Sequence, residues 1–313
     1  MGEKQVRGTT ALTRNKVQLF PTTQRPIRRQ GPDSTIVSEA EVNNWFQTTA
    51  LSVGDHLTSD QPAKAIRPLY IWHDIFETDL LRIRKTDLIE YMIILTTSAL
   101  PYSARIALYT EEEIAFCRRH LLKMEEAELL FRCDSKWAAR TKFALKSRAD
   151  TLPQEARLPI VHNFIPLKRV IEKSQYTCPL IEQIIYTVLK KGESWFFTSD
   201  RGNSYWAIPV RAGNQTKVGL VTPYGMYCYN VMGQGITGGT HTNSQFRDLV
   251  FGAIPEEFEE GLEGRLRLPG EESVIGDQAD FVFDQMIDDS YTSSTTFETS
   301  AKIIPCVLCA PWV

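Results

Sequence analysis

A hairpin pattern in the second half of the chain most constrains its fold. Residues 217–221 and 226–231 are rich in aromatic and β-branched side chains and have the length of strands. Between them stands TPYG, residues 222–225, which has the composition of a turn. A third stretch of the same kind, predicted as a strand, covers residues 205–210. A short turn joins antiparallel neighbours, so the sequence predicts an antiparallel sheet in this region.

Helical patterns are interleaved with these strands. Thr110 and Glu113 have the spacing of a capping box, and apolar residues then recur at helical spacing: Ile114, Cys117, Leu121 and Met124. Residues 69–76 and 243–252 are predicted as shorter helices. Another begins at Pro179, and its predicted apolar face consists of Ile181, Ile184, Ile185, Val188 and Leu189. Helices mixed with antiparallel strands indicate an α+β fold.

Basic side chains are concentrated although the chain of 313 residues has a formal net charge of -3. Seven Lys or Arg stand in residues 1–35, where few apolar residues recur. We therefore expect residues 1–64 to be a basic, disordered leader. Residues 132–148 form a second basic stretch, whose cations are Arg132, Lys136, Arg140, Lys142, Lys146 and Arg148. A solvated surface is the simplest interpretation of that stretch, with phosphate contact as the alternative.

The cysteines and the hydropathy pattern bear on the compartment. The six cysteines have no regular spacing, which favours free, packed thiols in a reducing environment. Cys306 and Cys309 form a lone CxxC, which we interpret as core or rim thiols and not as a zinc site. No apolar run approaches the roughly 18 residues of a membrane span, and the start lacks a secretory signal. We expect an intracellular protein, in cytoplasm or nucleus, with no membrane contact.

Acidic residues at the ends of two predicted strands are the candidates for chemistry. Asp200 follows the aromatic strand at residues 195–198, and Asp288 and Asp289 follow a strand that begins at residue 281. Carboxylates brought side by side in a sheet can hold a pair of divalent cations through oxygen ligands. The alternative is that these residues lie in ordinary exposed turns. The residue pattern alone leaves both interpretations open.

Several motifs, in order along the chain, resemble those of the reverse transcriptase of gypsy-type LTR retrotransposons, in their chromovirus-like, fungal branch. FTSDRGNSYWAIPV at 197–210 resembles the first carboxylate motif, and MIDD at 286–289 resembles the second. MGQGITG at 232–238 resembles the loop under the incoming nucleotide. The remaining matches are SKWAARTKF at 135–143, VHNFIPL at 161–167 and YTCPLIE at 176–182.

The resemblance implies the fingers and palm of a right-hand polymerase, with an antiparallel palm sheet packed on helices. Residues 65–170 would form the fingers with part of the palm, and residues 171–313 the palm. The thumb is expected to be missing, because the chain ends at Val313, soon after the second carboxylate motif. The activity implied is RNA-directed DNA polymerisation, in which a dNTP is added to the 3′-hydroxyl of a primer on an RNA or DNA template.

The same resemblance implies roles for particular residues. Asp200, Asp288 and Asp289 would bind two Mg²⁺ or Mn²⁺ ions for nucleotidyl transfer. Tyr205 stands where the family has a steric gate against a ribose 2′-hydroxyl, although the residue pattern alone favours an ordinary strand aromatic. Gln234 would contact the incoming nucleotide. The triphosphate would be held by two residues of the fingers, Lys146 and Arg157.

The sequence departs from the family pattern at two places. Met286 replaces an aromatic residue, and residues 239–241 (GTH) replace Ala-Pro. With the expected loss of the thumb, these departures leave a second interpretation open, a catalytically silent retroelement remnant that binds nucleic acid or another partner. The histidines add no metal site, since His162 and His241 are more simply interpreted as packing or loop residues. The oligomeric state is left open.

Overall fold

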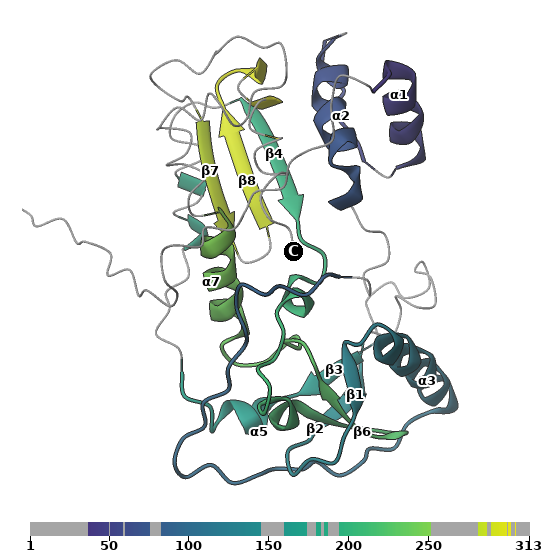
Figure 1. The fold of residues 1–313 in the computed structure, drawn as a ribbon, viewed down its shortest axis with the longest axis vertical. Coiled ribbons are helices and arrows are strands. Elements are labelled where there is room, and N and C mark those ends of the chain that lie inside the picture. The colour runs from purple at the N-terminus through teal and green to yellow at the C-terminus, as the bar shows by residue number, and fades with distance from the viewer. Residues whose placement is uncertain are drawn as a thin grey trace, which may run out of the picture.

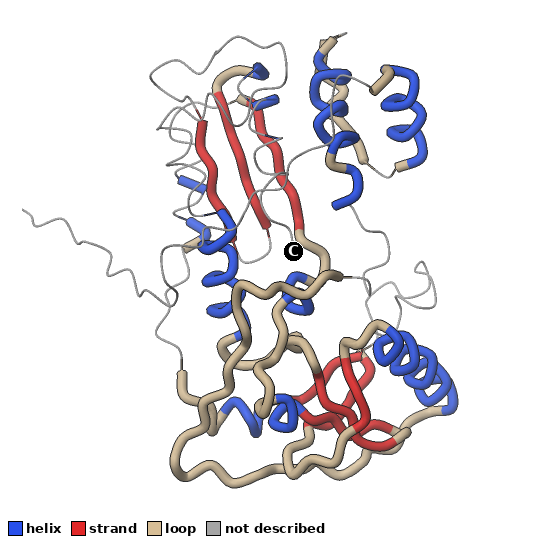
Figure 2. Tube along the Cα trace, in the orientation of Figure 1, coloured by secondary structure: helices blue, strands red, loops and turns tan. Residues whose placement is uncertain are grey.

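The fold is known from a computed structural model of the 313-residue chain. It describes residues 37–49, 51–58, 60–75, 83–144, 160–173, 180–182, 185–186, 194–251, 281–286, 289–298, 300–301 and 304. Two sheets organise these residues, one of five strands and one of three. They lie at opposite ends of the view in Figure 1, and the chain between them runs mostly as loop (Figure 2).

The five-stranded sheet has the order β1-β6-β5-β2-β3. Its strands are β1 (Leu130–Arg132), β2 (Ala139–Phe143), β3 (Ile160–Asn163), β5 (Gly219–Thr222) and β6 (Gly225–Tyr229). Three of its four pairings are antiparallel, and of these the sequence predicted the one between β5 and β6. The fourth pairing, between β2 and β5, is parallel and was not predicted.

The predicted hairpin is confirmed. Thr222 of β5 pairs with Gly225 of β6, which leaves Pro223 and Tyr224 as the turn. The Thr222 hydroxyl donates to the Gly225 carbonyl at 2.8 Å and accepts from the Tyr224 amide at 3.1 Å. These bonds satisfy polar groups that the tight turn leaves without ladder partners.

The strand predicted over residues 205–210 is wrong for its first half. Residues Ser204–Ala207 form a 3₁₀ helix, η3, and only Pro209 and Val210 make isolated β-bridges. Asn203 has a left-handed backbone with φ of 51°, and its carbonyl accepts the Trp206 amide at 2.8 Å. This turn at Asn203 leads directly into η3, so residues 204–207 are not extended. A similar 3₁₀ helix, η4 (Gln215–Val218), takes the first two residues of the strand predicted over 217–221, so that β5 begins at Gly219.

The three-stranded sheet is antiparallel throughout and has the order β4-β8-β7. Its strands are β4 (Trp195–Asp200), β7 (Phe281–Met286) and β8 (Asp289–Ser294). Along β4 half-buried and exposed residues alternate, with Phe197 and Ser199 on the inner face. The strand predicted from residue 281 is thus confirmed, and it leads into a hairpin with β8.

Helix α3 (Glu111–Glu126) begins with the predicted capping box. The Thr110 hydroxyl accepts the Glu113 amide at 3.2 Å, and the Glu113 carboxylate accepts the Thr110 amide at 2.8 Å. Of the predicted apolar face, Cys117, Leu121 and Met124 are buried and Ile114 is half-buried. The buried face of this helix therefore lies where the sequence predicts it.

The prediction of a disordered leader is wrong for part of residues 1–64. Helix α1 (Glu39–Thr48) lies within it, and α2 (Gln61–Ile71) begins before its end. Ser38 and Glu41 form a capping box at the start of α1, a signal that the low apolar content obscured. The short helix predicted near residue 69 corresponds to the end of α2 and to η1 (His73–Ile75).

Two further helices have both of their ends among the described residues. Helix α5 (Ile165–Lys168) follows β3, and α7 (Gly239–Phe251) confirms the helix predicted at 243–252 but begins four residues earlier. Residues 239–241, which replace the family's Ala-Pro, therefore start a helix. Pro179 lies outside the described residues. Of its predicted apolar face, Ile181 and Ile185 are described and are 45% and 51% exposed, so that face is not buried there.

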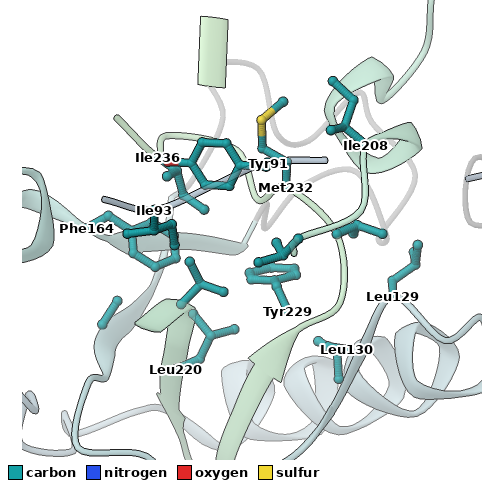
Figure 3. Close-up of a cluster of buried hydrophobic side chains, with 14 of the residues drawn as sticks. Tyr91, Ile93, Leu129, Leu130, Phe164, Ile208, Leu220, Tyr229, Met232 and Ile236 are labelled. Carbon is teal, nitrogen blue, oxygen red and sulfur yellow. The ribbon is translucent and has the colours of Figure 1, made fainter. Parts of the chain in front are cut away.

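The main hydrophobic core joins the five-stranded sheet to the segments that cross above it (Figure 3). Tyr91 and Ile93 alternate inward from an extended segment, while Leu220 and Tyr229 come from β5 and β6. Met232, from the loop after β6, is fully buried in the same cluster. Among the described residues, no helix is long and apolar enough to cross a membrane.

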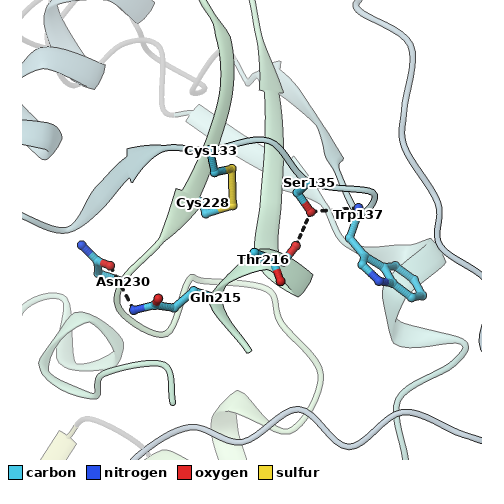
Figure 4. Close-up of a disulfide and its surroundings, with 7 residues drawn as sticks. All are labelled: Cys133, Ser135, Trp137, Gln215, Thr216, Cys228 and Asn230. Atoms are coloured by element: carbon cyan, nitrogen blue, oxygen red, sulfur yellow. Dashed lines mark hydrogen bonds between the residues drawn. A yellow bond between two sulfur atoms is a disulfide. The ribbon is translucent and has the colours of Figure 1, made fainter. Parts of the chain in front are cut away.

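Two cysteines overturn the prediction that the thiols are free. Cys133, just after β1, and Cys228, in β6, form a disulfide with a Cα–Cα distance of 5.9 Å (Figure 4). The antiparallel pairing of β1 with β6 brings the two residues together across a sequence separation of 95. Cys117 is buried and free, as predicted. The other three cysteines, including Cys306 and Cys309, lie outside the described residues.

Candidate functional site

The backbone brings two predicted acidic positions together at one end of the three-stranded sheet. Asp200 is the last residue of β4 and Asp289 is the first residue of β8, and the antiparallel register pairs them directly. Directly opposed residues in an antiparallel ladder have Cα atoms roughly 4.5–5.5 Å apart. Asp288 lies outside the described residues and precedes Asp289 in the chain. The pairing therefore joins the two carboxylate motifs.

The chemistry of this donor set fits a hard divalent cation. Asp200 is exposed at the sheet end, and carboxylate oxygens are the ligands that Mg²⁺ prefers. Within the part of the chain that the structure describes, no three His, Cys, Asp or Glu side chains converge as a metal site. Asp288 lies outside that part of the chain. A site of two or three carboxylates at this end of the sheet stays a prediction.

The residue after Asp200 is held by helix α7. The Arg201 guanidinium donates through Nη2 to Asn243 Oδ1 at 2.9 Å and lies 4.8 Å from the centre of the Phe246 ring. Asn243 is fully buried and also donates to the Ser204 hydroxyl at 3.4 Å. These contacts fix the backbone on both sides of the 201–204 turn. This role of Arg201 was not predicted; the signal available in the sequence was the polar pair Asn243 and Ser244 at the start of a predicted helix.

Tyr205, the predicted steric gate, packs against the first turn of α7. Its hydroxyl lies 3.2 Å from Thr240 Oγ1. A Cβ atom added at Gly239 would come within 3.1 Å of Tyr205 Cε1, so the glycine leaves the space for the ring. Tyr205 is half-buried in η3 and is not a strand residue. The structure thus places it after Asp200 on a short rigid turn, while its role toward a nucleotide stays a prediction.

Gln234 lies in the loop that was predicted to contact the nucleotide. Its side chain is exposed, and Nε2 donates to Asn203 Oδ1 at 3.4 Å, so the loop touches the segment that follows Asp200. The left-handed backbone of Gly235 and Gly238, with φ of 81° and 80°, shapes the loop. On its other side the Tyr91 hydroxyl donates to the Thr237 carbonyl at 2.5 Å. Burial raises the pKa of Tyr91, which keeps this donor protonated.

The described part of the basic stretch lies on the other sheet. Arg132 belongs to β1, where its guanidinium lies 5.4 Å from the centre of the Tyr227 ring, and Arg140 and Lys142 belong to β2. Lys146 and Arg157, the predicted triphosphate ligands, lie outside the described residues. Tyr205 and Asn203, the hydrogen-bond partner of Gln234, therefore lie within five residues of Asp200 along the chain. The predicted cationic partners are not among the described residues.

The histidines behave as packing residues. His162 Nδ1 lies 3.2 Å from Thr141 Oγ1, and its ring centre lies 5.7 Å from that of Tyr229. Burial lowers the pKa of His162 to about 3, so the ring is neutral at physiological pH. His241 lies in α7 with a buried Nδ1 atom. The packing interpretation of His162 is confirmed.

Comparison with known proteins agrees with the motifs. No protein-family model matches the chain. The Tf2-7 and Tf2-8 transposon polyproteins of Schizosaccharomyces pombe are 29% identical to it over 103 residues, which is 33% of this chain. The chain is similar to retrotransposon polyproteins. It spans only 8% of the length of these relatives.

Solved structures of foamy viral protease-reverse transcriptase share the fold of this chain. The crystal structure of a prototype foamy virus protease-reverse transcriptase mutant superposes with a TM-score of 0.63 and 13% identity, covering 88% of this chain and 32% of that one. The foamy viral protease-reverse transcriptase in complex with an RNA/DNA hybrid gives a TM-score of 0.59 and 12% identity, covering 81% and 29%. The resemblance to a reverse transcriptase and the mixed α/β fold are thereby confirmed.

Proposed function

We propose that this chain is the fingers-and-palm part of a retrotransposon RNA-directed DNA polymerase. Its reaction would add a dNTP to the 3′-hydroxyl of a primer paired to an RNA or DNA template. The observation that carries the proposal is the direct backbone pairing of Asp200 with Asp289, because it joins two carboxylate motifs that are far apart in the sequence. The fold shared with foamy viral protease-reverse transcriptase supports it. We assign residues 65–170 to the fingers with part of the palm and residues 171–313 to the palm.

The carboxylates of Asp200, Asp288 and Asp289 would hold two Mg²⁺ or Mn²⁺ ions. When bound, such ions stabilise the attacking primer oxygen and the departing pyrophosphate. The protein's own contribution is a fixed frame for the carboxylates. Arg201, anchored on Asn243 and Phe246, holds the chain directly after Asp200, and the β4–β8 ladder holds it directly before. A rigid supporting shell of this kind preserves the position of a site residue.

Tyr205 and Gln234 would form the nucleotide side of the site. The Tyr205 ring, confined by Gly239 and Thr240, would exclude a ribose 2′-hydroxyl by its bulk. The Gln234 side chain, exposed and in contact with Asn203, would contact the incoming nucleotide from the loop. Both contact the turn that follows Asp200 or the helix that anchors it, which supports a common role.

Template and triphosphate would be held by cations of the fingers. Arg140 and Lys142 of β2 are the described members of the basic stretch, and Lys146 and Arg157 complete the proposed triphosphate clamp. Binding that depends on such phosphate contacts weakens as salt concentration rises. A retroelement enzyme of this kind acts inside the cell, so we place the protein in the cytoplasm or nucleus.

Primer extension on an RNA template tests the proposal. Wild type would be compared with Asp200→Asn, and with Asp87→Asn, a matched change of an exposed aspartate outside the site. We expect Asp200→Asn to lose at least about 100-fold in rate, since loss of even an outer-shell partner of a metal costs roughly 10–100-fold. Asp87→Asn should extend as wild type does.

The other outcomes separate the alternatives. Equal extension by wild type and Asp200→Asn would refute the carboxylate site. If neither wild type nor any variant extends the primer, fluorescence anisotropy with a labelled RNA/DNA hybrid tests whether the chain binds nucleic acid without catalysis. Salt-dependent binding by well-folded protein would then favour the catalytically silent, nucleic-acid-binding retroelement remnant.

A further inference from the structure

We propose that Cys133 and Cys228 form a thiol–disulfide exchange site for small thiols and disulfides of the glutathione class. In this site the external thiolate attacks the sulfur of Cys133, and Cys228 is the buried partner whose sulfur is displaced. The proposal is independent of polymerase activity, because it rests on the five-stranded sheet and not on the carboxylates.

The sheet itself brings the two sulfur atoms together. Phe131 pairs with Cys228 in the β1–β6 ladder, and the Cys133 amide continues the ladder by donating to the Met226 carbonyl at 3.1 Å. Cys133 and Cys228 are therefore diagonal neighbours on the ladder. Residues two apart in a strand lie on the same face, so both side chains face the same side. The β1–β6 pairing therefore holds the two sulfur atoms close whenever the sheet is folded.

The two cysteines differ in exposure. Cys228 lies in the middle of β6 and is 0% exposed, whereas Cys133 lies past the end of β1 and is partly exposed. Thiol–disulfide exchange requires an attacking thiolate to approach the sulfur along the S–S axis, so access selects which sulfur is attacked. The exposure difference assigns the entry position to Cys133.

The exchange balances with an external thiol as the only co-reactant. An external thiolate attacks Cys133 Sγ, the protein S–S bond breaks, and its electron pair leaves on Cys228 Sγ, which takes a proton from water. A second external thiolate attacks the external sulfur of the mixed disulfide and releases the Cys133 thiolate. The protein disulfide is thus reduced to two thiols while two external thiols are oxidised to one external disulfide. Closure is the same sequence reversed.

The bond anchors the connection from β1 to β2, residues 133–138. The Ser135 hydroxyl ties that connection to η4 by donating to the Thr216 carbonyl (Figure 4). Within the connection, the Trp137 amide donates to Ser135 Oγ at 2.9 Å. Opening the disulfide removes the covalent tie at the upstream end of this connection and leaves the Cys133 amide bond to the Met226 carbonyl there. It also removes a cross-link between residues separated by 95 positions, which constrains the unfolded chain. We expect the melting temperature of the sheet to fall by about 10 °C on reduction.

The experiment uses the full chain equilibrated in glutathione buffers of varied oxidised-to-reduced ratio. Samples are quenched in acid, alkylated with N-ethylmaleimide and analysed by peptide mass spectrometry. We expect a cross-linked peptide containing Cys133 and Cys228 that disappears as the reduced fraction rises. Thermal unfolding with and without a phosphine reductant measures the shift in wild type without any substitution. Cys117→Ser, which removes a buried free thiol, is the matched control and should keep the shift.

Single variants test the direction of attack. With oxidised glutathione, Cys228→Ser should acquire a glutathione adduct on Cys133 at least about 10-fold faster than Cys133→Ser acquires one on Cys228, because only Cys133 is accessible. Equal rates, or faster reaction at Cys228, would overturn the assignment of the entry sulfur. Complete alkylation of both thiols in wild type at every glutathione ratio would overturn the site itself.

Discussion

Gly219→Ala should open the five-stranded sheet at its centre. Gly219 is the first residue of β5, and an added Cβ atom would lie 2.1 Å from the backbone oxygen of Trp137. Carbon and oxygen that are not bonded approach to about 3.3 Å. The two backbone segments must therefore separate by about 1 Å. The neighbouring residue Leu220 is fully buried and pairs in parallel with Ala139 of β2, so the separation falls where β5 joins β2.

The magnitude follows from which atoms collide. Overpacking relieved by side-chain shifts costs roughly 1–3 kcal/mol. Here the obstacle is a backbone oxygen, so the destabilisation lies at or above the upper end of that range of roughly 1–3 kcal/mol. The lower conformational entropy of alanine in the unfolded chain offsets only about 0.4–1 kcal/mol of it. We expect a net loss of about 3 kcal/mol in the free energy of unfolding. Gly213→Ala is the control, because Gly213 has φ of 82° but open space around it, and should cost only about 1 kcal/mol.

Urea unfolding combined with amide hydrogen exchange measures this loss. Exchange in peptides that cover β5 and β6 reports the sheet specifically, and 1.4 kcal/mol corresponds to about a tenfold change in an opening equilibrium. We expect exchange in Gly219→Ala to be at least about 100-fold faster there than in wild type. A loss equal to or smaller than that of Gly213→Ala would show that the backbone approach at Trp137 is not what the glycine serves.

Three further changes follow from local contacts. Thr110→Ala removes the cap of α3 and should lower the free energy of unfolding by about 1 kcal/mol in urea titrations, while Thr110→Ser should not. His162 has a folded pKa of about 3 against about 6.5 unfolded, so the unfolded chain takes the proton first as pH falls. Above about pH 6.5 the neutral ring makes its full contribution to the free energy of unfolding. Between about pH 6.5 and about pH 3 this contribution falls by about 1.4 kcal/mol for each pH unit. His162→Gln should remove that slope from the pH dependence of unfolding, and an unchanged slope would refute the assignment. Tyr91→Phe loses the bond to the Thr237 carbonyl and should speed hydrogen exchange in the loop at residues 232–238 by about tenfold.

Features that depend on a few consecutive residues were predicted correctly from the sequence. The capping box at Thr110 and Glu113, the buried face of α3 and the β5–β6 hairpin each require contacts over only a few positions. Their signals are side-chain chemistry at fixed spacing and apolar periodicity, and both are present in the local sequence. The motif order also indicated the family resemblance. Prediction failed locally at residues 204–207, where the left-handed turn at Asn203 prevailed over strand propensity.

Long-range pairing is what only the tertiary structure decided. The direct pairing of Asp200 with Asp289, the bond between Cys133 and Cys228 and the parallel contact of β2 with β5 each join distant parts of the chain. Sequence spacing carries no record of which strands become neighbours, because strand order and register are set by the burial of the whole sheet face. The anchoring of Arg201 on Asn243 has the same origin. The residues of the candidate site were therefore proposed from sequence motifs, whereas the contacts around them depend on the β4–β8 pairing and on the position of α7.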